Sequence, residues 1–122
     1  MTDRAALLDY ADHLLDGTLP LGSRSTRVAA VMARSAFEDW LDEHCPWAVT
    51  AVIRPSTSAQ LAVLDALDDD DADVGQRAKR VWHGLSRMCH HHAYELQPSP
   101  AEVRELVAEV RQLDGSPHQS HP

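Results

Sequence analysis

The sequence contains few aromatic residues and few glycines. Only 5% of its 122 residues are Phe, Trp or Tyr and five are glycine, whereas hydrophobic residues make up 43%. Alanine, leucine and valine carry this apolar content, and such a composition favours helix-on-helix packing over a β-sheet. A chain of this length is long enough to bury one real core. We therefore expect a single domain built from helices.

Disulfides and membrane-spanning segments are also not indicated. The two cysteines, Cys45 and Cys89, are too few and too far apart in sequence for a disulfide framework. No stretch approaches the roughly 18 consecutive apolar residues of a transmembrane helix. The first ten residues, MTDRAALLDY, carry acids and no apolar run, so we expect no signal peptide. These features predict a cytoplasmic protein without a membrane partner.

Positive charge is scarce. The formal net charge is −8 with eight histidines counted as neutral. An acidic chain repels phosphate backbones at long range, which disfavours a general nucleic-acid binder. A local basic patch remains compatible with this balance.

Apolar residues recur at helical spacing in several segments. We expect helices at residues 3–16, 25–44 and 73–96, a shorter one at 56–67, and a last one that begins at the SPAE sequence, residues 99–102. In the second helix we expect an inward face made of Val28, Val31, Met32, Ala36, Trp40 and Leu41.

The boundaries of these helices carry their own signals. Gly17 predicts the end of the first helix. Ser99 is expected as an N-cap, with Pro100 at the first helical position and Glu102 closing a capping box. The segment WAVTAVIR, residues 47–54, would have no partner as a lone strand, so we expect a buried connection or a helix. The predicted fold is an all-α bundle of four or five helices over residues 1–115, followed by a disordered tail, residues 116–122.

Chemistry-bearing residues concentrate in RMCHHHAY, residues 87–94. On a regular helix the apolar residues of the fourth long segment gather on one side, together with His92. The opposite side then carries a cationic and aromatic stripe: Arg80, His83, Arg87, His91 and Tyr94. Three consecutive histidines on a helix point in three directions and cannot share one ion, so we expect no metal site and no cofactor.

A purely structural interpretation of these residues stays open. A histidine on an apolar face is usually a core residue with its hydrogen bonds satisfied, and His92 fits that description. Arg80 and Arg87 are compatible with simple ion pairs to carboxylates of neighbouring helices, which would stabilise the fold little.

The order Arg87, four residues, His92, one residue, Tyr94 resembles the motif of the HEPN superfamily, and especially that of the HepT-like toxins. The resemblance covers eight residues. It implies a HEPN-like helical fold and metal-independent RNA cleavage in a homodimer cleft. It also implies that the histidine is the general base on a ribose 2′-hydroxyl and that the arginine holds the scissile phosphate. In HepT-like systems the tyrosine is modified by a partner nucleotidyltransferase, which implies a cognate antitoxin of this kind.

Two alternatives remain open at this stage. A regular helix places Arg87 and His92 about 140° apart, so either the helix is irregular there or the working histidine is His91. Arg80 and His83 would then extend the substrate-binding surface. The second alternative is a non-catalytic, HEPN-like interaction module that binds a protein partner.

Overall fold

The computed structural model describes residues 3–17, 24–67, 72–89 and 99–115. These residues contain helices and no strand, which confirms the all-helical prediction. The helices of the described part are α1 (Arg4–Leu15), α2 (Ser25–His44), α3 (Pro46–Val49), α4 (Thr57–Leu67), α5 (Ala72–Cys89) and α6 (Pro100–Gly115). The prediction of four or five helices was one short, because the four-residue α3 follows α2 directly.

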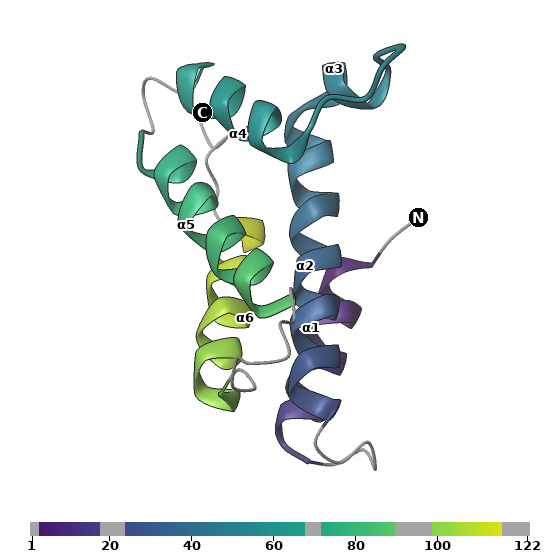
Figure 1. Ribbon diagram of the computed structural model, residues 1–122, viewed down its shortest axis with the longest axis vertical. Helices are drawn as coiled ribbons and strands as arrows, with labels where there is room; N and C mark the ends of the chain where they lie inside the picture. The colour runs from purple at the N-terminus through teal and green to yellow at the C-terminus, as the bar shows by residue number, and fades with distance from the viewer. Residues whose placement is uncertain (1–2, 18–23, 68–71, 90–98, 116–122) are drawn as a thin grey trace.

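Helix α2 is the axis around which the other helices pack. Its 20 residues run along the long direction of the molecule, with α1 beside its lower part, α5 and α6 on another side, and α4 across its upper end (Figure 1). Helix α6 also contacts α1 and α5, so α1, α2, α5 and α6 enclose a common interior. The predicted limits of α2 agree with the structure.

The core combines small and aromatic side chains. Four alanines of α2 are fully buried, and side chains this small let neighbouring helices approach α2 closely. Phe37 stacks on Trp40 of the same helix and on Trp82 of α5, with ring centroids 5.8 and 6.2 Å apart. These aromatic contacts join α2 to the helix that carries the candidate site.

Side-chain caps and a glycine define several helix ends, among them the predicted N-cap Ser99 and the predicted stop Gly17. Asp3, Ser56 and Ser99 each accept a hydrogen bond from a backbone N–H three residues further on, at 3.1 Å. Gly17 has a φ of 76°, a conformation that glycine adopts at little cost, and it follows α1 as predicted. Helix α6 begins at Pro100 and has Ser99 as its N-cap, as predicted.

Val31 was wrongly predicted to face inward, since it is 47% exposed. At about 100° per residue it points roughly 150° away from the centre of the buried face of α2. The buried face instead runs through Ala29, Ala33 and Phe37. The error came from favouring a large aliphatic residue over small alanines.

The segment 47–54 was predicted to be a buried connection or a helix; residues 47–49 are helical, and the prediction of a buried connection was wrong for the rest. The segment forms the single turn of α3 and then an exposed connection to α4, in which Val52 and Ile53 are 103% and 84% exposed. Only Ala48 of this segment reaches the core. No packed helix covers the rest, because α3 contacts mainly α2.

Helix α5 begins one residue before its predicted start and extends through Cys89. The remainder of the predicted helix, residues 90–96, lies outside the described residues, as does the predicted tail, residues 116–122.

Candidate functional site

Helix α5 separates its apolar and cationic side chains as the sequence predicts. Ala78, Val81 and Leu85 are fully buried or nearly so, and Met88 is 6% exposed. The candidate residues of the opposite side are exposed: Arg80, His83 and Arg87. Their spacing of three and then four residues places them on one face of the helix. The structure therefore brings these three candidates together.

This cationic face lines one side of an open groove of about 620 Å³ between α5 and α6. Gly84, Met88 and Leu106 line the groove between its two charged edges. A Cβ atom on Gly84 would lie 2.8 Å from the Cδ2 atom of Leu106, so the absence of a side chain there permits the close approach of α6. The groove is lined on its edges by Arg80, His83 and Arg87 from α5 and by Glu102, Glu105 and Glu109 from α6.

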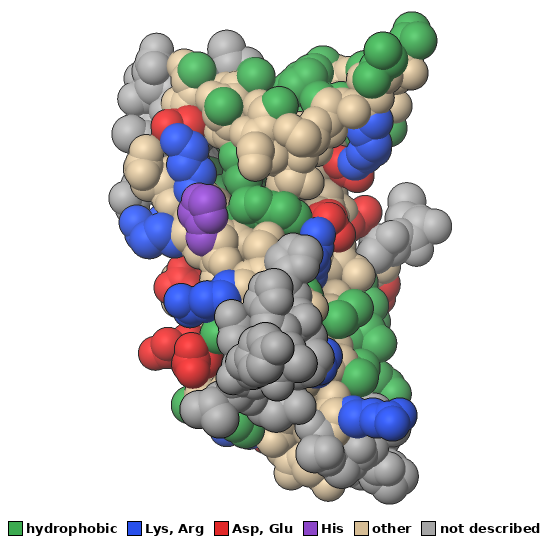
Figure 2. Space-filling model, in the orientation of Figure 1, with side chains coloured by type: hydrophobic (Ala, Val, Ile, Leu, Met, Phe, Trp, Pro, Cys, Tyr) green, Lys and Arg blue, Asp and Glu red, His purple; other side chains and the backbone are tan. Residues whose placement is uncertain are grey.

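The three glutamates have the same helical spacing as the three candidates that they face. Arg87 Nη2 lies 3.9 Å from Glu102 Oε2, and the two side chains are 72% and 53% exposed. An ion pair this long and this exposed contributes little stability. The arginine is thus available to another anion, although the groove as a whole is not positively charged. Figure 2 shows this mixture of cationic, histidine and acidic side chains over α5 and α6.

Glu102 is held by the start of α6. The Ser99 hydroxyl accepts the hydrogen bond of the Glu102 backbone N–H, which fixes the first turn of the helix. The Glu102 carboxylate points to Arg87 at the C-terminal end of α5. Because Arg87 lies at the end of α5 and Glu102 at the start of α6, this pair shows that the two helices run antiparallel.

The remaining motif residues, His91, His92 and Tyr94, lie outside the described residues. Their distances from Arg87 therefore stay predictions, as does the choice between His91 and His92. Cys89, the last described residue of α5, is half-buried, and burial raises the pKa of its thiol, while the nearby Arg34 opposes that rise.

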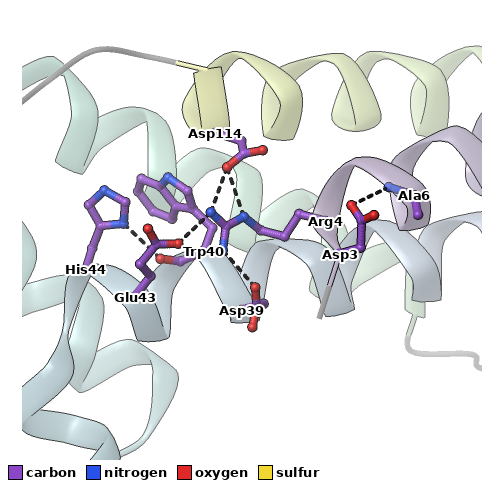
Figure 3. A network of polar contacts seen from close by, with 8 residues as sticks. All are labelled: Asp3, Arg4, Ala6, Asp39, Trp40, Glu43, His44 and Asp114. Atoms are coloured by element: carbon purple, nitrogen blue, oxygen red, sulfur yellow. Dashed lines mark hydrogen bonds and ion pairs between the residues drawn. The ribbon is translucent and has the colours of Figure 1, made fainter. Parts of the chain in front are cut away.

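A second polar cluster was missed by sequence reasoning. The Arg4 guanidinium contacts Asp39 Oδ2 at 2.7 Å, Glu43 Oε2 at 2.5 Å and Asp114 Oδ1 at 2.9 Å (Figure 3). These contacts tie α1 to both α2 and α6. Burial alone would lower the pKa of Arg4, but its hydrogen bonds to the three carboxylates outweigh burial and raise that pKa. Asp39 and Asp114 are 35 and 110 residues from Arg4 in sequence, so no local pattern connects them.

The described residues offer neither a metal-binding cluster nor a membrane-spanning helix. Among residues 3–17, 24–67, 72–89 and 99–115, no three His, Cys, Asp or Glu side chains are grouped so that they could hold a metal ion. Within the same residues, no helix is both long and apolar enough to cross a membrane.

The chain was compared with protein-family models, with characterised proteins and with solved structures, and none of them matches it.

Proposed function

We propose that this protein is a HEPN-type, metal-independent endoribonuclease of a toxin or phage-defence system, with a HEPN-like fold. The observation that carries the proposal is the exposed Arg87 at the end of α5, at the head of the Arg–His–Tyr motif and on one face with Arg80 and His83. Its ion pair with Glu102 is long and exposed, so a phosphate diester can replace Glu102 at little cost.

The proposed reaction uses two kinds of side chain. Arg87 binds the scissile phosphate through two parallel N–H donors, and its charge stabilises the charge that develops there. His92, or His91, takes the proton of the ribose 2′-hydroxyl, a task that suits a group titrating near neutral pH. The 2′-oxygen then bonds to phosphorus, the bond from phosphorus to the 5′-oxygen breaks, and that oxygen takes up a proton. The products are a 2′,3′-cyclic phosphate and a 5′-hydroxyl.

Association belongs to the same proposal. The cationic face of α5, which carries Arg87, would lie at a two-fold contact, because such a contact brings two copies of α5 together and completes the cleft. The protein is therefore expected to be a homodimer. Tyr94 would be the residue that a partner nucleotidyltransferase, the cognate antitoxin, modifies.

The test is cleavage of single-stranded and structured RNA in EDTA, followed by analysis of the product ends. His92→Ala and His91→Ala identify the working histidine, since only loss of the base stops cleavage while the melting temperature is kept. Tyr94→Phe should retain the fold and weaken cleavage at most. A nuclease should also gain RNA affinity in Glu102→Gln, because this change removes the carboxylate that competes with phosphate for Arg87. No cleavage by the wild-type protein, together with a destabilised His92→Ala variant, would refute the proposal.

One observation favours a second candidate, a non-catalytic helical module that binds a protein partner. Glu102, Glu105 and Glu109 line the same groove as the cationic face. A groove with both charges is complementary to a protein surface with both charges, and its carboxylates repel RNA. For this candidate Glu102→Gln should weaken binding of the partner, the reverse of the effect on a nuclease.

A further inference from the structure

Apolar side chains gather on the surface at α3 and at the connection from α3 to α4. Trp47 is 40% exposed, Val49 53%, Ile53 84% and Val52 103%. Figure 2 shows hydrophobic side chains crowded at this end of the molecule, with a basic side chain and then acidic side chains below them. Four large apolar residues within seven positions form a contiguous patch rather than scattered exposure, and such patches mark sites of interaction.

The patch is held in place by polar contacts. Thr50 caps α3, and its hydroxyl donates a hydrogen bond to the Pro46 carbonyl at 3.3 Å. Arg54, directly after Ile53, forms an ion pair with Asp42 of α2. Asp42 Oδ1 also accepts a hydrogen bond from Gln60 Nε2 of α4 at 3.2 Å. Both ends of the exposed connection are therefore anchored.

An acidic pocket of about 930 Å³ adjoins this patch. Val49 lines the pocket, and so does Asp42, which anchors Arg54. The pocket surrounds the Arg4 cluster, in which one guanidinium serves three carboxylates. Two negative charges of that cluster are left uncompensated. Glu43 is the most exposed of the three carboxylates, at 59%.

We propose that the patch and the acidic pocket together dock a basic amphipathic segment of a protein partner. Its apolar side chains cover Val49, Val52 and Ile53, and its lysines or arginines meet the excess carboxylates around Arg4. Among the described residues there is no strand whose edge could be extended, so side chains carry the contact and a helical segment fits best. This surface is separate from the α5–α6 groove and does not depend on the proposed nuclease activity.

Charge excludes two other occupants. A second copy of this chain across a two-fold axis would set the acidic pocket against itself, and like charges face to face are repulsive. An anionic membrane surface would be repelled by the same carboxylates.

The test uses a synthetic helical peptide of about 18 residues, with leucines at positions i, i+3, i+4 and i+7 and lysines elsewhere. Binding is followed by the fluorescence anisotropy of the labelled peptide. The double variant Val52→Ser/Ile53→Ser should weaken binding by about tenfold or more, as loss of a central apolar anchor does. Glu43→Gln should weaken it severalfold and flatten its dependence on salt. Both sites are exposed, so the melting temperature should stay near that of the wild type.

Val31→Ser on α2 is the control for a general loss of apolar surface, since Val31 is an exposed aliphatic residue outside the patch, at 47%, and it should leave binding unchanged. The proposal is overturned if a peptide with glutamates in place of the lysines binds as tightly. It is also overturned if Val52→Ser/Ile53→Ser binds like the wild type. Self-association, or binding to lipid vesicles, that this double variant abolishes would assign the patch to a second copy or to a membrane, and would refute the proposal too.

Discussion

Replacing Arg4 by methionine should destabilise the fold more than loss of any ordinary surface arginine. Methionine keeps much of the side-chain length but removes the charge that three carboxylates share. The Arg4 side chain is 18% exposed, whereas those of Asp39, Glu43 and Asp114 are 33%, 59% and 28% exposed. Buried hydrogen bonds to charged groups contribute about 1.5–3 kcal/mol each, and exposed pairs contribute about 0–1 kcal/mol. The network lies between these limits.

From these limits we expect Arg4→Met to lower the free energy of unfolding by about 2 kcal/mol. For a domain of this size that loss corresponds to a fall in melting temperature of roughly 8 °C. The raised pKa of Arg4 keeps the group charged across the neutral and alkaline range, so the loss should be nearly constant from about pH 7 to about pH 10. Urea denaturation followed by circular dichroism measures it.

Arg104→Met is the matched control. Arg104 Nη2 lies 3.0 Å from Asp16 Oδ1, but both side chains are at least half-exposed, so the control should cost about 0.5 kcal/mol or less. A double-mutant cycle with Asp114→Asn should give a favourable coupling energy between Arg4 and Asp114. Equal losses for Arg4→Met and Arg104→Met would refute the argument that the Arg4 cluster joins α1 to α2 and α6.

Three further predictions concern packing, titration and metal. Gly75→Ala should lower the free energy of unfolding by about 1–2 kcal/mol, because the new Cβ would lie 2.9 Å from the Asp65 Cα atom. Gly115→Ala is the control and should not lower it, since nothing lies within 4 Å of the new Cβ. Equal melting temperatures for the two variants would contradict this prediction. Burial raises the pKa of the Cys45 thiol above its ordinary value of 9.0, so its contribution to stability is complete below about pH 9 and declines above it. As the pH rises from about 9 to about 10.5, the free energy of unfolding of Cys45→Ala should therefore fall less than that of the wild type. Equal falls for the two proteins would refute the assignment of this pH dependence to Cys45. Calorimetric titration should show no zinc site that survives a chelator wash, and one zinc retained per chain would overturn the geometric argument against a metal site.

Local signals in the sequence were sufficient for the helices themselves. The N-cap Ser99, the terminal Gly17 and the apolar spacing that predicted helices α2 and α5 all depend on residues within a turn or two of one another, and the structure has each of these features. The exposure of Arg87 followed from the same spacing.

Contacts between helices were not accessible to the same reasoning. Glu102, Glu105 and Glu109 have a visible helical spacing, but that they face the cationic side of α5 depends on how α6 packs. The Arg4 cluster joins residues up to 110 positions apart. The exposure of Val52 likewise depends on the absence of a packed neighbour, which composition does not indicate.

The most direct test of the proposed function compares RNA turnover by the wild-type protein, Arg87→Ala and Arg77→Ala in EDTA. Arg77 is the matched control, since it lies on the same helix, bonds to Gln112 at 3.2 Å and is not part of the groove. The account predicts products with 2′,3′-cyclic phosphate ends from the wild type and Arg77→Ala. It predicts a loss of about a hundredfold or more for Arg87→Ala, as expected when a charged donor to the transition state is removed. Turnover by Arg87→Ala equal to that of Arg77→Ala would contradict it.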